Sequence, residues 1–147
     1  MLNHDFIKRK IKLIQEDLLE LKKYETLTDA GFSSNTTAKL VIERLLEQII
    51  TRAIDINQHC IAELGRGKEK VRTYEDTFLI MAELKFYPSV FAKKIAPSAG
   101  LRNILVHEYD ELDSHLVYQS MKKALREYPQ YCQYLLKFLN AHRHDRR

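Results

Sequence analysis

The sequence predicts an all-α fold, an antiparallel bundle of four to five main helices, and three observations support it. Apolar residues recur at intervals of three and four along most of the chain, which is the spacing of one face of an α-helix. No segment alternates polar and apolar residues between turn signals, so a β-sheet is not expected. Glycine and proline are scarce, with four and three among 147 residues, as is typical of helix-rich globular proteins.

The N-terminal half contains two expected helices. The first spans about 2–24, and its apolar stripe consists of Ile7, Ile11, Ile14, Leu18 and Leu21. Small polar residues over 26–37 predict a loop and the start of the second helix. That helix should begin at residue 34 or 36 and end before Gly65. Its two adjacent apolar strips predict a central helix, or one that also faces a second protomer.

The next two helices are expected to be shorter. Thr73 and Asp76 have the spacing of a helix N-cap, so a helix should cover about 74–87. Pro88 would end it, because proline cannot continue the helical hydrogen bonds. A short helix is then expected over 89–96.

The last helix should span about 113–140. Pro129 lies inside this range and is expected to kink or divide the helix. Asp113 follows other acidic residues, which favour a helix N-terminus. We expect four tyrosines of this helix at the rim of the core: Tyr118, Tyr128, Tyr131 and Tyr134.

Length and composition limit the class of protein. The chain is long enough for one domain, 1–147, with a basic tail over 141–147 that is expected to fray. Cys60 and Cys132 lack C-x-x-C spacing and should be reduced thiols in or near the core. No apolar run reaches the roughly 20 residues that span a bilayer, and no signal peptide is evident, so a cytoplasmic protein without a membrane partner is expected. The net charge of +4 is compatible with a polyanionic partner without demonstrating one.

One short stretch, 102–109, contains the side chains best suited to catalysis or binding. At about 100° per residue, a helix would place four polar side chains on one side: Arg102, Asn103, His107 and Tyr109. Ile104 and Leu105 would face the opposite side and bury against neighbouring helices. Asn103 and His107 are also four residues apart, so their side chains can touch.

An arginine beside a histidine suits reactions at a phosphodiester. Histidine exchanges a proton near neutral pH, and the guanidinium can neutralise charge on the phosphate oxygens. RNA already contains the nucleophile, its 2′-hydroxyl, so neither a cofactor nor a metal is required. A second interpretation is purely structural: Arg102 pairs with Glu108 or Asp110 on the surface, and His107 caps a helix C-terminus.

The spacing of Arg102, His107 and Tyr109 resembles the R-x4-H-x-Y signature of the HepT family, a branch of the HEPN domains. The resemblance also includes the long apolar helix over 44–64, the turn and helix over 73–78, and the whole segment 101–110. Leu112 and Asp113 complete it, so the likeness runs over about 5–140.

The resemblance implies an all-helical homodimer in which Arg102 and His107 line a cleft at the dimer interface. It implies a metal-independent endoribonuclease that is the toxin of a type II or type VII toxin-antitoxin pair. Arg102 and His107 would be catalytic, with Asn103 orienting one of them. The implied partner is an MntA-type nucleotidyltransferase antitoxin, which would silence the toxin by adding AMP to Tyr109.

Two sets of basic residues are weaker candidates for RNA contacts. Lys93 and Lys94 lie just before the motif, and Arg66 and Lys68 lie in a glycine-punctuated loop over 65–72. Each set can equally be a solvated surface.

Two alternatives for the function stay open. One is a catalytically silent helical module that binds a nucleotidyltransferase or RNA. The other, weaker, is metal-dependent hydrolysis using His107, Glu108, Asp110 and His115, although their spacing matches no usual set of metal ligands.

Overall fold

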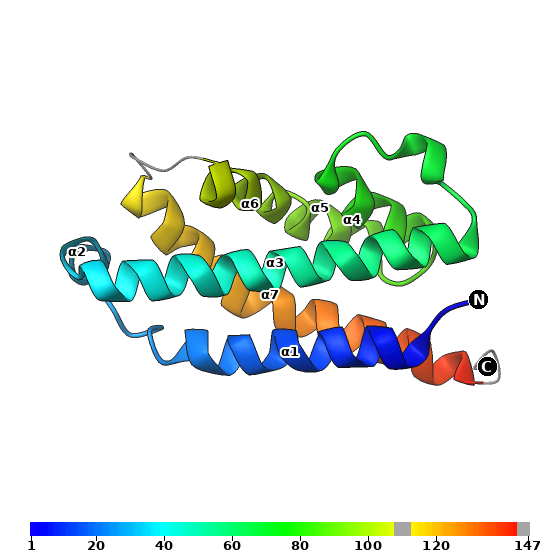
Figure 1. Cartoon of the computed structure of the whole chain (residues 1–147), viewed down its shortest axis with the longest axis horizontal. Coiled ribbons are helices and arrows are strands. Elements are labelled where there is room, and N and C mark those ends of the chain that lie inside the picture. Colours follow the sequence, from blue (N-terminus) through cyan, green and yellow to red (C-terminus); the bar gives the residue numbers. More distant parts are fainter. Residues whose placement is uncertain (108–112, 144–147) are drawn as a thin grey trace.

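Long helices set the length of the molecule, and shorter ones pack along them. The computed structural model describes residues 1–107 and 113–143. Within these ranges the elements are α1 (His4–Lys22), α2 (Asp29–Ser34), α3 (Thr36–Leu64), η1 (Lys68–Lys70), α4 (Tyr74–Glu83), α5 (Ser89–Ile95), α6 (Ser98–His107) and α7 (Ser114–Ala141). Helices α1, α3 and α7 follow the long axis, and α4, α5 and α6 line one side of α3 (Figure 1). The all-helical prediction is confirmed.

Capping residues explain where several helices begin and end. The Asn35 side chain accepts a hydrogen bond from the Ala38 N–H at the start of α3, and Gly65, with a φ of 66°, ends that helix as predicted. Thr73 and Asp76 form a reciprocal capping box at the start of α4. Asp113 caps α7 by accepting hydrogen bonds from the backbone N–H groups of the first turn.

Two boundaries differ from the sequence prediction. The segment expected to be a loop contains α2, whose N-cap is Thr28. Helix α4 ends at Glu83 instead of reaching Pro88, because Lys85 adopts a φ of 74°. The backbone N–H groups of Lys85 and Phe86 then bond to carbonyls of the last turn, which is the Schellman arrangement usually formed with glycine. Pro88 serves instead as the N-cap of α5.

Helix α7 also differs from the prediction, since it runs unbroken through Pro129. A proline inside a helix costs about 3 kcal/mol. Burial on either side of it offsets this cost, because Tyr128 and Tyr131 are both 0% exposed. The prediction of a tyrosine rim is therefore wrong for these two residues and fits only the half-buried Tyr118 and Tyr134.

The core is centred on α3, which contacts α1, α2, α4, α6 and α7. A polar network crosses it. The Tyr131 hydroxyl donates to Asn57 Oδ1 at 2.6 Å, Asn57 Nδ2 donates to Thr77 Oγ1 at 3.2 Å, and Thr77 Oγ1 donates to the Tyr74 carbonyl at 2.6 Å. Asn57 is therefore part of the core. Asp55, on the same helix, pairs with Lys10 of α1 at 3.1 Å.

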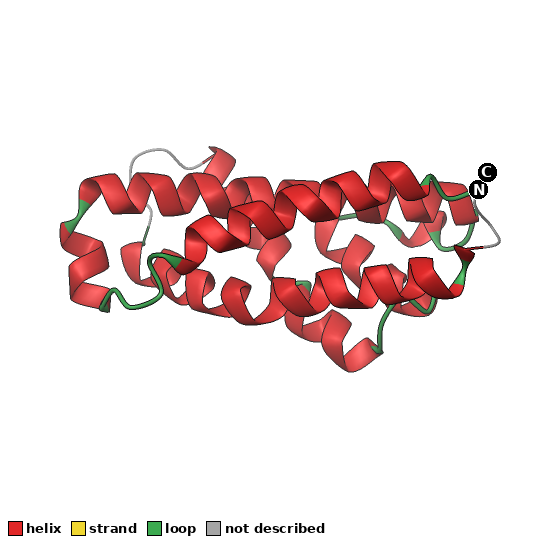
Figure 2. Cartoon of the chain, turned by 90° about the horizontal axis from the view of Figure 1, so that it is seen from below, coloured by secondary structure: helices red, strands yellow, loops and turns green. Residues whose placement is uncertain are grey.

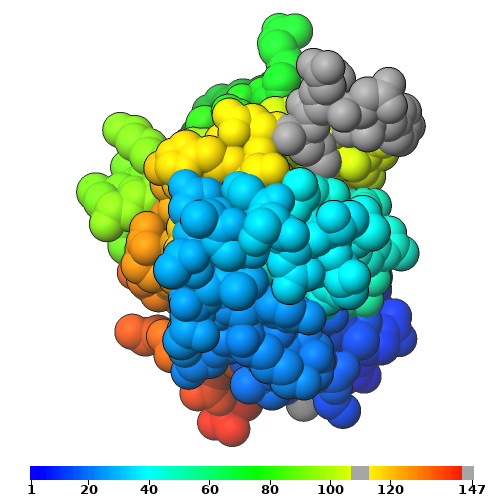
Figure 3. All heavy atoms as spheres, turned by 90° about the vertical axis from the view of Figure 1, so that its left-hand side faces the viewer, coloured from blue at the N-terminus to red at the C-terminus, as the bar shows by residue number. Residues whose placement is uncertain are grey.

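The two ends of the bundle have different contents. The N-terminus and the end of α7 lie at one end, which is also where α3 finishes (Figures 1 and 2). The opposite end is covered by the connection between α1 and α2, with the start of α7 beside it (Figure 3).

Cys60 and Cys132 are buried free thiols, as predicted. Among the described residues, no helix is long and apolar enough to span a membrane.

Candidate functional site

Helix α6, which carries the first half of the motif, is attached to the three helices around it. Ser98 Oγ and the Tyr128 hydroxyl are 2.7 Å apart, which ties the start of α6 to α7. Leu101 is buried, and Leu105 packs against the core. A Cβ on Gly100 would come within 3.2 Å of the Glu75 side chain, so α6 also lies close to α4.

The Arg102 side chain is oriented by contacts from two other helices. Its Nε donates to Thr51 Oγ1 of α3 at 3.2 Å. Its guanidinium carbon lies 5.4 Å from the centre of the Tyr74 ring of α4, within the range of a cation–π contact. These two contacts hold the guanidinium in place. No carboxylate in the described ranges forms an ion pair with Arg102, and Glu108 and Asp110, the partners that the structural interpretation would need, lie outside those ranges.

The neighbours of Arg102 lie as the helical spacing predicts. Asn103 is exposed, whereas Ile104 and Leu105 are half-buried. Ile104 borders a cavity of about 300 Å³ between α3, α6 and α7. Helix α6 therefore turns its apolar residues inward and presents Asn103 to the exterior.

The second half of the motif is only partly visible. Helix α6 ends at His107, so Asn103 and His107 are four residues apart on one helix, as expected. The side chain of His107, and Glu108, Tyr109 and Asp110 entirely, lie outside the part of the chain that the structure describes. The predicted roles of His107 and Tyr109 stay predictions.

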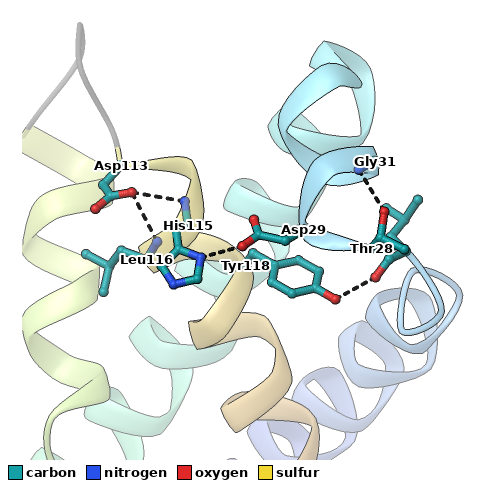
Figure 4. Close-up of polar contacts among 8 residues, drawn as sticks. Thr28, Asp29, Gly31, Asp113, His115, Leu116 and Tyr118 are labelled. Carbon is teal, nitrogen blue, oxygen red and sulfur yellow. Dashed lines mark hydrogen bonds and ion pairs between the residues drawn. The ribbon is translucent and has the colours of Figure 1, made fainter.

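Just after the motif, the chain is anchored where α7 meets α2 (Figure 4). Asp113 Oδ1 accepts from the His115 N–H at 3.0 Å, and the His115 ring pairs with Asp29. The Tyr118 hydroxyl donates to the Leu27 carbonyl at 2.6 Å. The segment carrying Tyr109 is thus bounded by α6 on one side and by this junction on the other. His115 engages a carboxylate of α2, so it is committed to a structural contact.

Of the two lysines upstream of the motif, Lys94 lies on the α7 side of α6. Lys93 and Lys94 are exposed in the last turn of α5. Lys94 borders the same cavity of about 300 Å³ as Ile104, together with Glu127. Burial raises the pKa of the Glu127 carboxyl, while nearby lysines and Arg126 act in the opposite direction. Arg102 faces α3 and α4, so the structure does not bring these lysines to its guanidinium.

Arg66 and Lys68 lie beyond the end of α3, at the end of the bundle where α7 also finishes. From Thr51, which contacts Arg102, to Gly65, helix α3 rises by about 21 Å at about 1.5 Å per residue. The structure therefore separates Arg66, at the start of this loop, from the motif, whereas the far end of the loop leads into Tyr74, which contacts Arg102. If Arg66 contacts RNA, it does so at a different place.

Metal ligation was the weakest interpretation. Within the described ranges, no group of three or more His, Cys, Asp or Glu side chains is arranged to hold a metal ion. Glu108 and Asp110 fall outside those ranges.

Sequence reasoning missed Thr51 and Tyr74, the two residues that orient Arg102. Thr51 is half-buried within the apolar α3, and Tyr74 stands next to the capping residue of α4. Neither carries a local motif, because their role comes from the packing of α3 and α4 against α6.

Comparisons with known proteins agree with this arrangement. The family model described as "Ribonuclease HepT-like" matches residues 14–135. The chain is 38% identical over 133 residues to a "tRNA nuclease HepT" of Aphanizomenon flos-aquae, covering 90% of this chain and 89% of that protein. It is 29% identical over 128 residues to an "mRNA nuclease HepT" of Shewanella oneidensis, covering 85% and 86%.

A solved structure shares the fold. The tri-AMPylated HEPN toxin of Shewanella oneidensis, in complex with its MNT antitoxin, superposes with a TM-score of 0.78 at 22% identity, covering 92% of this chain and 99% of that one. The family match spans most of the helical bundle, including α6 and its supports on α3 and α4. The chain therefore belongs to the HepT-like ribonuclease family.

Proposed function

We propose that this chain is a metal-independent endoribonuclease toxin in which Arg102 binds the scissile phosphate. The observation that carries the proposal is the guanidinium oriented by Thr51 and by the Tyr74 ring. A cation fixed in advance stabilises charge that develops on phosphate oxygens without reorganising during the reaction. The HepT-like family match supports ribonuclease activity.

The chemistry needs one proton-transfer group, and His107 is the candidate. It would accept the proton of a ribose 2′-hydroxyl as the 2′-oxygen attacks phosphorus, or give a proton to the departing 5′-oxygen. The products would be a 2′,3′-cyclic phosphate and a 5′-hydroxyl. Asn103, exposed one residue after Arg102, would orient the phosphate or the imidazole.

A groove for RNA would be completed by a second copy of the chain. The cavities of about 830 and 300 Å³ in one protomer border neither Arg102 nor Asn103. A homodimer formed across α6 would place two motifs around one groove. RNA would then be held by residues of both copies.

The proposed partner is an MntA-type nucleotidyltransferase that transfers AMP to Tyr109. A HEPN toxin of the same fold is tri-AMPylated and bound to an MNT antitoxin. AMP on Tyr109 would place negative charge beside the phosphate site and so oppose RNA binding.

Cleavage of RNA in EDTA tests the catalytic assignment. A tRNA pool is the first substrate to try, since the relative at 38% identity is named a tRNA nuclease. Arg102→Ala and His107→Ala should each lower the rate by about a hundredfold or more, and Arg126→Ala, an exposed arginine of α7, is the matched control. Equal activity of Arg102→Ala and Arg126→Ala would contradict the proposal, as would loss of wild-type cleavage in EDTA.

Mixing the two inactive variants tests the shared groove. If the arginine of one copy works with the histidine of the other, a mixed dimer of Arg102→Ala and His107→Ala contains one intact pair and regains activity. No recovery, in dimers shown to be mixed by mass spectrometry, would place both groups within one protomer.

An intact-mass measurement after co-expression with the nucleotidyltransferase tests the modification. The wild type should gain the mass of AMP, and Tyr109→Phe should not gain AMP at that position. Tyr24→Phe serves as the control. AMP found only on other residues would overturn the assignment of Tyr109.

A further inference from the structure

A groove of about 830 Å³ lies at the end of the bundle where α3 and α7 finish, away from the motif helix α6. Its walls come from the N-terminus, the end of α3, the connection between α4 and α5, and the end of α7. This volume is within the range of pockets that bind small molecules. None of the contacts of Arg102 reaches it, so it is a site separate from the candidate active site.

Stacked rings form one side of the groove. The rings of Phe86 and Phe138 lie 3.9 Å apart with 26° between their planes, and those of Phe138 and His142 lie 4.0 Å apart with 17° between their planes. His142 Nδ1 lies 2.8 Å from the Phe138 carbonyl oxygen, so Nδ1 donates that hydrogen bond. The half-buried His142 ends this stack with a flat surface.

Among the described residues, the charged side chains that line the groove are all basic: Arg66, Lys85 and Lys137. They are exposed, and within the described ranges none of them forms an ion pair. The amino group of Met1, which also borders the groove, is paired with Glu63 at 2.9 Å. The groove thus combines a flat aromatic surface with a rim of positive charge that no described carboxylate pairs with.

Lys85 occupies its place on the rim at a conformational cost. It is the non-glycine residue with positive φ in the described ranges, at 74°. A side chain in the left-handed region costs on the order of 1 kcal/mol compared with glycine. Residues held in such conformations are often found at ligand sites. A lysine therefore occupies a position where glycine would adopt the backbone conformation at lower free energy.

We propose that this groove binds a nucleotide, with the base stacked on the outer face of the His142 ring, whose inner face lies on Phe138, and the phosphate held by Lys85, Lys137 and Arg66. Aromatic surfaces stack on any base, and basic side chains at the rim bind its phosphate. An acidic peptide would also satisfy the charges, but it would leave the flat stack without a planar group to cover it.

The nucleotide can be free, or it can be an unpaired nucleotide of an RNA strand. In the second case the groove is an accessory RNA site, and this part of the inference rests on the proposed ribonuclease function. It would then grip RNA at a distance from the scissile phosphate and raise affinity without taking part in the chemistry. Arg66 would then contact RNA in this groove, since its distance from Arg102 rules out a contact at the motif.

Binding of a fluorescent, non-cleavable 2′-O-methyl oligonucleotide over a range of salt concentrations tests the proposal. The double variant Lys85→Gly with Lys137→Ala removes two rim charges, and glycine suits the backbone at position 85. Its affinity should fall by about tenfold, and the slope of log affinity against log salt should fall by about 1.4. The matched control, Lys12→Ala with Lys22→Ala, removes two exposed lysines of α1 and should bind like the wild type. Equal weakening in both double variants would overturn the proposal.

Competition separates a nucleotide site from a simple anion site. AMP should displace the oligonucleotide far better than inorganic phosphate does, and His142→Ala should lower AMP affinity by about fivefold or more, because stacking is lost. Displacement by phosphate as effective as by AMP would refute the nucleotide. Absence of AMP and oligonucleotide binding in the wild type would refute it as well. Circular dichroism and urea unfolding verify that each variant is folded.

These results are independent of cleavage. If the wild type cleaves RNA while the groove variants bind the oligonucleotide normally, the groove proposal fails and the ribonuclease proposal stands. If AMP binding depends on the groove residues while neither the wild type nor any variant cleaves RNA, the groove proposal stands and the ribonuclease proposal fails.

Discussion

The buried hydroxyl of Tyr131 allows a sharp test of what the polar network contributes to stability. Tyr131, Asn57 and Thr77 are each 0% exposed. Burial raises the pKa of the Tyr131 hydroxyl well above 10, so the group stays protonated and donates to Asn57 at neutral pH. Tyr131→Phe would leave Asn57 Oδ1 buried without a donor.

An unpaired buried acceptor costs about 1–3 kcal/mol. We therefore expect Tyr131→Phe to lower the free energy of unfolding in urea by that amount. For a chain of this size, Tm should fall by about 2–4 °C per kcal/mol. Tyr24→Phe is the matched control, because the half-buried Tyr24 hydroxyl makes no hydrogen bond within the described residues.

A double variant sharpens the test. Asn57→Leu combined with Tyr131→Phe removes both polar partners at little change in volume, so it should be less destabilised than the sum of the two single changes. If Tyr131→Phe and Tyr24→Phe differ by less than about 0.5 kcal/mol, the network does not stabilise the fold as argued here.

Three further predictions concern the site, the groove and pH. Thr51→Val and Tyr74→Leu each remove one contact of Arg102 and should lower kcat/KM for RNA by about two- to fivefold, with unfolding curves near wild type; unchanged kinetics in both would show that Arg102 needs neither. Lys85→Gly should be more stable to urea than Lys85→Ala by about 1 kcal/mol, and the opposite order would contradict the left-handed conformation of Lys85. Burial raises the pKa of the Cys60 and Cys132 thiols from 9.0 to about 12, so the stability due to the neutral thiols is complete below pH 9 and is lost as the pH rises toward 12. The test compares the wild type with the double variant Cys60→Ala, Cys132→Ala by measuring urea midpoints from pH 8 to pH 11. The midpoint should depend less on pH in the double variant than in the wild type.

Much of the fold could be predicted because its signals are local. The start and end of α3 follow from Asn35 and Gly65, and the start of α4 follows from its capping box. The errors arose where packing overrides local preference. Pro129 stays inside α7 because the residues around it are buried, and a lysine, which is no sequence signal for a left-handed turn, ends α4 early.

The site divides in the same way. The motif predicted the family, which is confirmed, and it predicted that Asn103 and His107 would share one helix. It could not predict that Arg102 would contact Thr51 and Tyr74, since these contacts depend on how three helices cross. The roles of Asn103, His107 and Tyr109 remain predictions for the experiments above.

Thr51 and Tyr74, the two residues that contact the Arg102 side chain, differ in how firmly the fold holds them. This difference decides which of them fixes the position of the guanidinium. Thr51 is part of a 29-residue helix packed on most of its faces, so its hydroxyl has little freedom. Tyr74 is the first residue of α4, and its carbonyl accepts from Thr77, which the core network holds through Asn57. A change at Tyr131 can therefore reach the Tyr74 ring through the network without touching Arg102. If it does, Tyr131→Phe will lower kcat/KM at temperatures where the variant is fully folded, whereas a network that only stabilises the fold will leave kcat/KM unchanged.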